Sequence, residues 1–359
     1  MNTLDALAGV LRVRPGAARP QALAGSRPDW AATLGRGKPA DLLPGLLSSV
    51  FSLCAHAHAL CARAAVDAAR GVEAPPSTAS LRDETLREHL RRLLLDWPTR
   101  LAGSPSAEAQ RALAACPLLR PDATDTPADW LERHLLGGRA QDWLAAWDAD
   151  PHAAFASWRA GRASWLAALM DDIAPIADRR LPVAPPLRVH ADDAGLRALA
   201  GRLADEDDFS RLPDLDGRCA ETGCWTRLDD APKAPPAPTA GARMAARIAE
   251  TVRLALPDAA SRLRSGQLAL GPGTGLAWAE MARGLLLHYV ELDPTRTVVQ
   301  RCRVLAPTEW NFHPQGAVAA SLETLDPQAP DVARHVAVLM NAWDPCVRYD
   351  LLLPEVAHA

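Results

Sequence analysis

Four potential metal ligands stand within eight residues, in the segment Cys54-Ala55-His56-Ala57-His58-Ala59-Leu60-Cys61. If the segment is helical, Cys54, His58 and Cys61 lie at positions i, i+4 and i+7 and share one face, whereas His56 points elsewhere. Thiolate and imidazole groups are suitable ligands for zinc, nickel or iron. Small cysteines in alanine-rich helices more often pack in the core, so this segment alone favours packing over metal binding.

A second cysteine that could do chemistry is Cys346, which follows Trp343-Asp344-Pro345. The Asp-Pro pair predicts a turn, so Cys346 should stand at the start of a new element. A lone cysteine in that position is weak evidence of a site.

The other cysteines are expected to be structural. Cys219 and Cys224 are too isolated for a four-ligand zinc site and have no histidine near them in the sequence. Cys116 and Cys302 stand alone in apolar surroundings, which predicts packing, and Cys61 is structural by default. An odd total of seven cysteines without framework spacing fits a reducing compartment better than a disulfide scaffold.

Composition and motifs exclude several classes of function. The chain has 39 Lys and Arg against 43 Asp and Glu, a net charge of −4, so no basic surface suggests nucleic acid. Residues 271–275 lack the lysine and the spacing of a phosphate-binding loop, and no nucleophile elbow occurs. Residues 1–5 do not resemble a secretory signal, and no apolar run could span a bilayer. We expect a cytoplasmic protein without a membrane partner.

Helical periodicity dominates the elements that must position these residues. Apolar spacing predicts helices over residues 42–69, 81–95, 131–147, 151–170, 191–204 and 240–256. Short β patterns cover residues 10–13, 268–270, 285–292 and 298–305, the last two as a hairpin. A loop-rich stretch near 205–242 includes a Pro/Ala surface linker at 232–242. We expect a mainly helical α+β fold, a single domain over 1–359 with a helical core and a small antiparallel β element.

Five blocks in the same order along the chain resemble the large subunit of nickel–iron hydrogenases. They are residues 35–41 with 49–60, Glu221-Thr222-Gly223 with Arg227, Glu280-Met281-Ala282-Arg283-Gly284, Pro307-Thr308-Glu309-Trp310-Asn311, and Asp344-Pro345-Cys346. Each block alone is weak, but together they cover most of the chain. The resemblance implies a shortened large-subunit-like fold with a pocket between the Cys54 segment and the Cys346 turn.

The first hydrogenase motif, Cys-x-x-Cys-x-x-x-His, is only partly present. Cys54 matches its second cysteine and His58 its histidine, whereas Phe51 takes the first cysteine position. The family's N-terminal Glu-Gly-His, which serves in proton transfer, is replaced by Ala8-Gly9-Val10. A thiolate and a carboxylate of the hydrogenase site are therefore missing.

The second hydrogenase motif, Asp-Pro-Cys-x-x-Cys-x-x-His, is also only partly present. Cys346 matches its first cysteine, but Tyr349 and Leu352 take the positions of the second cysteine and the histidine. In the family, four thiolates hold nickel, and two of these also bridge to an iron that carries cyanide and carbon monoxide. With two of the four missing, we expect no nickel, no hydrogen turnover and no enzymatic activity.

The resemblance still implies that the protein binds the iron half of the nickel–iron site, the Fe(CN)2(CO) unit. Cys54 and Cys346 would be its metal ligands. Arg283 and Thr308 match the residues that donate hydrogen bonds to the cyanides, and His58 matches a histidine close to the site. Without the family, Arg283 would be expected to cap a strand or pair with a carboxylate such as Glu280.

Within the hydrogenase-like proteins, the chain resembles the HupK/HoxV group of maturation factors. The Cys-x-His-x-His form of the first block and Thr-Glu-Trp-Asn-Phe-His-Pro at residues 308–314 carry this resemblance. It implies a scaffold or carrier for the iron unit during assembly of the large subunit. The implied partners are the large-subunit precursor, a small maturation chaperone and the iron-loading maturation proteins.

Two other hypotheses remain open at the level of sequence. In the first, the metal pocket has decayed and the chain is a metal-free interaction protein that holds maturation partners. In the second, it is an enzyme with a new zinc site at Cys54, His58 and Cys61.

Overall fold

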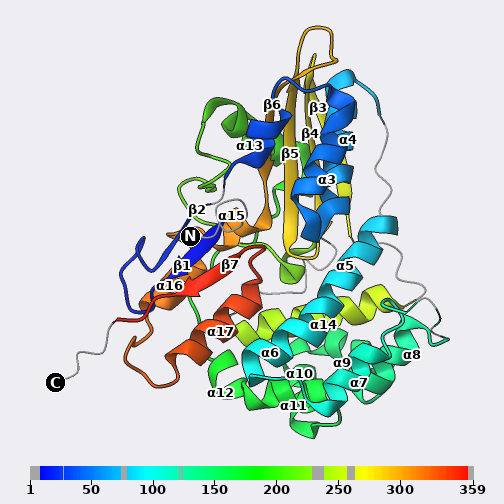
Figure 1. Ribbon diagram of the computed structural model, residues 1–359, viewed down its shortest axis with the longest axis vertical. Helices are drawn as coiled ribbons and strands as arrows, with labels where there is room; N and C mark the ends of the chain where they lie inside the picture. The colour runs from blue at the N-terminus through cyan, green and yellow to red at the C-terminus, as the bar shows by residue number, and fades with distance from the viewer. Residues whose placement is uncertain are drawn as a thin grey trace.

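The computed structural model describes residues 9–26, 28–73, 79–120, 122, 124–228, 238–256 and 263–354. A four-stranded sheet with helices on both faces forms one end of the molecule, and a group of helices forms the other (Figure 1). A small three-stranded sheet lies beside the junction between them. The expected mainly helical α+β fold is confirmed.

The four-stranded sheet is antiparallel and follows the order of the sequence. Its strands are β3 (Ser265–Gly271), β4 (Thr274–Met281), β5 (Gly284–Leu292) and β6 (Val299–Leu305). The hairpin expected from the last two β patterns is confirmed as β5 and β6. Strand β4 was not expected, because the glycines and proline at 271–275 conceal where it starts.

Helices α3 (Leu43–Val50) and α4 (Ala55–Arg70) cover one face of this sheet (Figure 1). Gly275 on β4 allows α4 to come this close, because a Cβ there would stand 2.2 Å from the Ala65 carbonyl oxygen. The contacts are with Ala65, Ala68 and Ala69, so they hold the C-terminal half of α4 against the sheet.

The single helix predicted over 42–69 is wrong, because the chain bends by 104° between Ala40–Val50 and Ser52–Arg70. Phe51 leaves the helical conformation at φ −99° and ψ 57°, and its ring stacks on His58. Cys54 therefore stands at the N-terminal end of α4, as the last residue of a short 3-10 helix (Ser52–Cys54) with φ −143° and ψ 40°, and not within a continuous helical face.

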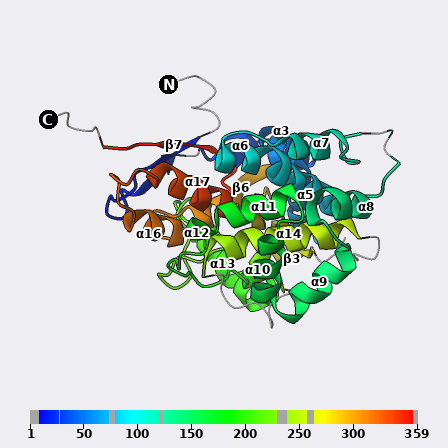
Figure 2. The same cartoon turned by 90° about the horizontal axis from the view of Figure 1, so that it is seen from below.

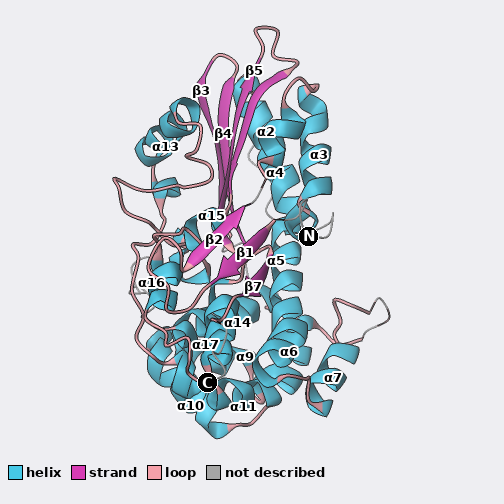
Figure 3. Ribbon diagram, turned by 60° about the vertical axis from the view of Figure 1, so that its left-hand side comes forward, coloured by secondary structure: helices cyan, strands magenta, loops and turns pink. Residues whose placement is uncertain are grey.

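The opposite face of the sheet is covered by α13 (Asp193–Asp205), as Figures 1 and 3 show. Its leucines pack with inward residues of the strands, among them Leu276. The next residue, Ala277, packs on the α4 side. This period of two residues explains why both faces of β4 are apolar.

The helical end of the molecule, seen from below in Figure 2, surrounds α14 (Ala240–Ala255). The other helices there are α5 (Ala79–Arg91), α6 (Trp97–Ala102), α7 (Ala107–Ala114), α8 (Pro127–Leu131), α9 (Ala140–Ala149), α10 (Pro151–Gly161), α11 (Trp165–Asp172), α12 (Ala174–Ala177) and α17 (Val332–Trp343). Helices α2 (Trp30–Gly35), α15 (Pro307–Asn311) and α16 (Ala317–Glu323) complete the described set. Two π-helical turns, Arg92–Asp96 and Glu132–Leu136, follow α5 and α8.

Two predicted helices are interrupted by left-handed residues. The helix expected over 131–147 breaks at Gly137, φ 69°, where a Cβ would stand 2.8 Å from the Ala163 carbonyl oxygen. The helix expected over 151–170 breaks at Arg162, φ 49°. Ser164 then caps α11 by accepting a bond from the Ala167 amide.

The helix predicted over 240–256 is confirmed as α14, and its start corrects the linker assignment. Residues 240–242, the end of the expected 232–242 linker, form the first turn of α14. Residues 229–237 lie outside the described part of the chain. Residues 206–228 contain turns and a short 3-10 helix at Cys224–Thr226, and so are poor in regular structure, as expected.

The small sheet joins distant parts of the chain (Figure 3). Strand β1 (Val10–Val13) pairs antiparallel with β2 (Leu23–Ser26) and parallel with β7 (Arg348–Leu351). Strand β1 was expected, but β2 and β7 were not, because their residues, Leu-Ala-Gly-Ser and Arg-Tyr-Asp-Leu, include few of the β-branched and aromatic types that favour strands.

Within the described residues, no single helix is long and apolar enough to cross a membrane. The bent pair Ala40–Val50 and Ser52–Arg70 meets the length and composition test only when its two arms are taken together.

The packing at Gly275 generates a stability prediction. Replacing Gly275 with alanine forces a methyl group into the α4 backbone, and we expect a loss of about 1 to 3 kcal/mol in the free energy of unfolding. Gly45→Ala is the matched control, because a Cβ at Gly45 in α3 meets nothing within 4 Å. Urea unfolding followed by circular dichroism measures both, and equal midpoints would contradict the close packing of α4 on β4.

Candidate metal-unit pocket

A buried carboxylate, Asp344, organises the centre of the molecule. It follows α17 in left-handed backbone at φ 57° and is 3% exposed. Three guanidinium groups surround it: Arg92 Nε at 2.8 Å, Arg247 Nη1 at 3.0 Å and Arg283 Nε at 3.5 Å. Burial raises the pKa of Asp344, but the three arginines outweigh burial and hold that pKa well below the ordinary value. The carboxylate is therefore charged at neutral pH.

The three arginines come from separate elements. Arg92 opens the π-helical turn after α5, Arg247 lies on α14, and Arg283 lies in the tight turn between β4 and β5. Gly284 lets this turn pack closely, because a Cβ there would stand 2.4 Å from Thr222 Oγ1. One carboxylate thus ties together a π turn, a helix and a hairpin.

Arg283 is the cation that faces the two cysteines of the predicted site. Glu88 Oε2 lies 3.0 Å from its Nη2. Burial lowers the pKa of Arg283, but Asp344, Cys54, Glu88 and Cys346, in that order, raise it above its ordinary value. Its Nη1 is buried and has no hydrogen-bond partner among the described residues. Arg283 therefore offers a buried donor without a partner among the described residues, and both thiols act on its charge.

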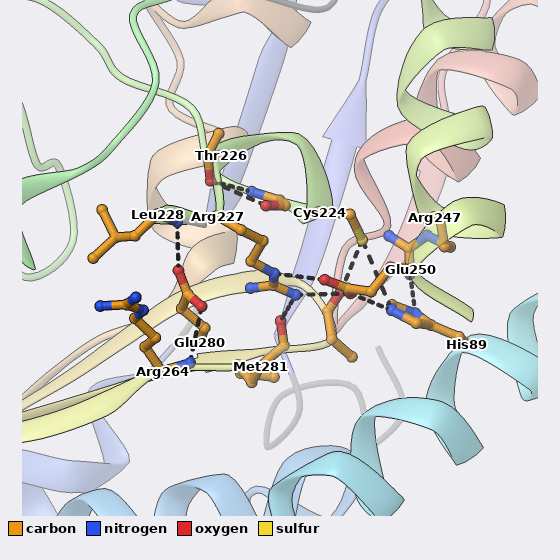
Figure 4. Close-up of polar contacts among 12 residues, drawn as sticks. His89, Cys224, Thr226, Arg227, Leu228, Arg247, Glu250, Arg264, Glu280 and Met281 are labelled. Atoms are coloured by element: carbon orange, nitrogen blue, oxygen red, sulfur yellow. Dashed lines mark hydrogen bonds and ion pairs between the residues drawn. The ribbon is translucent and has the colours of Figure 1, made fainter. Parts of the chain in front are cut away.

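The sequence raised the alternative that Arg283 pairs with Glu280. This alternative is wrong. Glu280 accepts bonds from His190 Nε2 at 3.1 Å and from the Leu228 and Arg264 amides at 3.1 and 3.0 Å. Figure 4 shows Glu280 between Leu228 and Arg264.

Cys346 stands two residues after Asp344 and contacts the predicted Thr308. Thr308 Oγ1 donates to Cys346 Sγ at 3.0 Å, and the Cys346 amide donates back to Thr308 Oγ1 at 3.4 Å. Thr308 lies in the first turn of α15 and is buried, whereas Cys346 is half-buried. This two-way contact fixes the Asp-Pro-Cys turn against α15.

Cys54 is held at the N-terminal end of α4. A carboxylate from α5, Glu84, accepts bonds from the His56 and Ala57 amides at 2.6 and 3.1 Å. Those amides would otherwise lack partners at the helix start, and the negative charge also suits the helix dipole. Cys54 is 6% exposed, and its charge contributes to the pKa of Arg283. His56 is exposed, in agreement with its expected outward direction.

The predicted His58 faces the sheet. Its Nδ1 lies 3.0 Å from His288 Nε2 on β5, and the Phe51 ring stacks on it at 4.0 Å between centroids. Burial lowers the pKa of His288 to about 3, so that imidazole is neutral. Cys346 thus contacts Thr308, both Cys54 and Cys346 act electrostatically on Arg283, and His58 lies against β5.

The two positions where hydrogenases have further nickel thiolates hold aromatic side chains. Phe51 stacks on His58. Tyr349 lies in β7 opposite Leu11, and burial raises the pKa of its hydroxyl. Leu352, at the position of the family's last histidine, is 37% exposed. Ala8, at the position of the carboxylate, lies outside the described residues.

The zinc site considered for Cys54, His58 and Cys61 is not formed. In the described part of the chain, the group with three converging metal-binding side chains is His89, Cys224 and Glu250. Cys61 is fully buried, and burial raises the pKa of its thiol above the ordinary value.

The expectation that Cys219 and Cys224 have no histidine nearby is wrong in three dimensions. Cys224 Sγ lies 3.8 Å from His89 Nε2, as Figure 4 shows. Cys219 Sγ lies 3.0 Å from His313 Nδ1. Sequence separations of 135 and 94 residues conceal both contacts.

A second buried ion-pair network lies beside the pocket (Figure 4). Arg227 donates to both oxygens of Glu250, at 2.7 and 2.9 Å, and to the Met281 carbonyl at 2.7 Å. His89 Nε2 lies 2.6 Å from Glu250 Oε2, and its Nδ1 is 3.4 Å from Arg247 Nη1. Arg247 therefore connects this network to Asp344.

The family-like block at 221–223 also has a structural role. Glu221 accepts two bonds from Arg243, at 2.7 and 2.9 Å, and one each from the indole nitrogens of Trp225 and Trp343. Sequence reasoning assigned no role to Arg92, Arg243, Arg247 or Asp344. The one available signal was an arginine in an apolar helix stretch, as at 243 and 247 of α14.

The shared carboxylate generates a pH-dependent prediction. We expect Asp344→Asn to cost about 3 to 5 kcal/mol at pH 7, because it leaves buried guanidiniums without their counter-charge. The folded-state pKa is depressed, so the contribution is present above the ordinary aspartate pKa of about 3.9 and is lost as the pH falls through the folded pKa. The gap between wild type and variant should therefore shrink below about pH 4.

Chemical denaturation at pH 7 and at pH 3.5 measures this gap. Asp125→Asn, which removes a surface pair with Arg133, is the control and should leave the midpoint unchanged. If Asp344→Asn lowers the free energy of unfolding by an equally small amount at both pH values, Asp344 does not stabilise the three arginines as proposed.

Comparison with known proteins identifies the family. The sequence matches no family model. It is 42% identical to the hydrogenase expression/formation protein HoxV of Cupriavidus necator, over 99% of this chain and 98% of that protein. It is 35% identical to HupK of Bradyrhizobium diazoefficiens, over 90% of both chains, and 34% identical to HupK of Rhizobium leguminosarum, over 94% of both.

Among solved structures, the fold is similar to hydrogenase large subunits. A variant of the [NiFeSe] hydrogenase of Desulfovibrio vulgaris Hildenborough gives a TM-score of 0.55 at 16% identity, over 90% of this chain and 92% of that one. An NAD+-reducing [NiFe]-hydrogenase gives 0.51 at 16% identity, over 90% and 91%. These similarities show the fold alone. By its relatives in sequence, the chain belongs to the HoxV/HupK family of hydrogenase expression/formation proteins.

Proposed function

We propose that this protein is a non-catalytic, cytoplasmic carrier that holds an Fe(CN)2(CO) unit during assembly of a nickel–iron site and passes it on. The observation that carries the proposal is the set of groups around Arg283: its Nη1 is a buried donor without a partner among the described residues, Cys346 Sγ accepts a bond from Thr308, and both Cys54 and Cys346 raise the pKa of Arg283. Thiolates would bind the iron, which is cargo here and not a resident cofactor. The names of the relatives, hydrogenase expression/formation proteins, agree with a role in maturation.

The donor set fits this cargo. Cyanide nitrogen is a strong hydrogen-bond acceptor, and Arg283 Nη1 is a buried donor without a partner among the described residues. The single proton of the Thr308 hydroxyl is directed at Cys346 Sγ. Thr308 therefore stabilises the thiolate ligand and reaches a cyanide only by leaving the sulfur.

The charge of the pocket also fits. Iron(II) with two cyanides is neutral, so ligation by two thiolates gives a negatively charged group. Arg283, Arg92 and Arg247 share one carboxylate, Asp344. Two further carboxylates, Asp96 beside Arg92 and Glu88 beside Arg283, lie nearer to solvent, with side chains that are 14% and 12% exposed against 2% for Asp344. An anionic cargo next to Arg283 lowers the cost of keeping these guanidiniums buried.

The same geometry argues against nickel as cargo. Nickel in the hydrogenase site depends on four thiolates, and here Phe51 and Tyr349 stand at two of those positions. Their rings pack against other residues, Phe51 on His58 and Tyr349 in the core beside β1.

The carrier role also implies partners. We propose that an iron-loading maturation protein and a small chaperone act with this protein before the transfer, and that the large-subunit precursor receives the iron unit.

Infrared spectroscopy of the protein purified without oxygen from hydrogenase-producing cells tests the carrier role. We expect cyanide and carbonyl bands, with iron and little nickel in the same sample. Cys54→Ala and Cys346→Ala should each abolish the bands, because both thiolates are needed as ligands.

Cys61→Ser is the matched control, since Cys61 is a neighbouring buried thiol outside the proposed ligand set. Its bands should match those of the wild type. If the wild type has neither bands nor iron but still copurifies with maturation partners, the protein is a metal-free interaction protein. Zinc that is lost in Cys61→Ser would instead support the enzyme hypothesis.

The Thr308 contact gives a finer prediction. Thr308→Val removes the hydroxyl at nearly constant volume, so it should weaken iron retention and shift the cyanide and carbonyl bands. Thr308→Ser keeps the donor to Cys346 Sγ and should behave as the wild type. Iron content after gel filtration and the infrared spectrum measure the difference. Identical spectra for Thr308→Val and Thr308→Ser would contradict the role assigned to the Thr308 hydroxyl.

A further inference from the structure

Two cysteine–histidine contacts lie outside the proposed pocket, and they differ in chemistry. One is Cys224 with His89, and the other is Cys219 with His313. The question for each is whether the imidazole nitrogen that faces the sulfur carries a lone pair or a proton, because only a deprotonated ring nitrogen can ligate a metal.

His89 does not offer such a lone pair to Cys224. Burial lowers the pKa of His89, so the ring is neutral. Its Nδ1 accepts from Arg247 Nη1, which places the ring proton on Nε2, where it donates to Glu250. Arg227 already occupies both oxygens of Glu250. A divalent cation would therefore meet a protonated nitrogen and two guanidiniums, and we assign this cluster to the ion-pair network.

His313 has the opposite arrangement. The Gln315 amide donates to His313 Nδ1 at 3.1 Å, so this nitrogen is an acceptor. The same nitrogen lies 3.0 Å from Cys219 Sγ. Burial lowers the pKa of His313, so the imidazole is neutral at pH 7. A lone pair and a sulfur thus stand within ligand distance of a common point.

The pair is also held in place by its scaffold. Three residues after Cys219, the Thr222 amide donates to Asn311 Oδ1 at 2.9 Å, and Asn311 Nδ2 donates to the Thr222 carbonyl at 2.8 Å. Asn311 stands two residues before His313. This buried two-bond clamp joins the two chain segments next to the point where Cys219 and His313 meet, so the geometry does not depend on the pair itself.

The pair is accessible as well as fixed. Cys219 and His313 are both half-buried, and Gln315 is exposed. Loss of the Gln315 bond on metal binding would cost little, because an exposed amide can donate to water instead. The nearby Asp214 acts electrostatically on both side chains and adds negative potential, although Arg202 pairs with it.

We propose that Cys219 Sγ and His313 Nδ1 form a second metal site, for a borderline-soft divalent transition metal of the zinc class. Thiolate and imidazole are the ligands that such ions prefer, and two protein ligands leave positions open to water. Binding replaces the Cys219 thiol proton with the ion and releases that proton to solvent, without oxidation or reduction. The site shares no residue with the proposed iron site at Cys54 and Cys346, so this proposal does not depend on the proposed carrier function.

Cobalt(II) titration of the full chain tests this site. The starting protein is Cys54→Ser/Cys346→Ser, so that the carrier pocket does not contribute. We expect one equivalent of cobalt with thiolate-to-cobalt charge-transfer absorption in the near ultraviolet. Adding Cys219→Ser should abolish this absorption, and adding His313→Gln should weaken binding by more than about tenfold, since it removes one of two ligands.

Cys224→Ser in the same background is the matched control, because Cys224 is the other thiol beside a histidine, and it should leave the cobalt spectrum unchanged. Circular dichroism confirms that each variant is folded. The proposal is overturned if the starting protein shows no cobalt–thiolate absorption. It is also overturned if the absorption survives Cys219→Ser or disappears with Cys224→Ser.

Discussion

The arrangement depends above all on one buried carboxylate that three guanidiniums share. Asp344 holds Arg92, Arg247 and Arg283, which come from a π turn, a central helix and a β hairpin. A buried charge of this kind is tolerated only with its partners in place, so the three elements can meet in one way alone. Cys346 stands two residues further on, and its position follows from the same constraint. The residue that links the elements thus also positions a proposed ligand of the cargo.

A second set of stabilising contacts, hydrogen bonds and one buried ion pair, surrounds the family-like blocks. Asn311 clamps Thr222 through two bonds, and Thr222 Oγ1 in turn accepts from the Leu285 amide at 2.9 Å. Glu221 binds Arg243 and two indoles. Blocks that resemble hydrogenase sequence thus serve two purposes: some line the proposed pocket, and others hold the strands and helices that carry it. This explains how the fold survives while half of the nickel ligands are absent.

The sequence predicted the helical fold class, the β5–β6 hairpin and helix α14. It misplaced Cys54 within a helix, because Phe51 leaves the helix in order to stack on His58, a contact that no periodicity encodes. The arginines were overlooked for a related reason. An arginine on an amphipathic helix reads as solvent-facing, yet Arg243 and Arg247 are 0% and 2% exposed because carboxylates from remote segments meet them. Contacts such as Cys219 with His313 depend on long-range folding and leave no local pattern.

The parallel pairing of β1 with β7 has a consequence for the order of events during synthesis. These are the first and last strands of the described chain, and β7 begins two residues after Cys346. Because a ribosome delivers the chain from its N-terminus, β1 can pair with β2 early but must wait for more than 300 further residues before β7 emerges. Asp344 reaches its arginines at the same late stage. The small sheet and the central ion pairs are therefore completed together, late in synthesis.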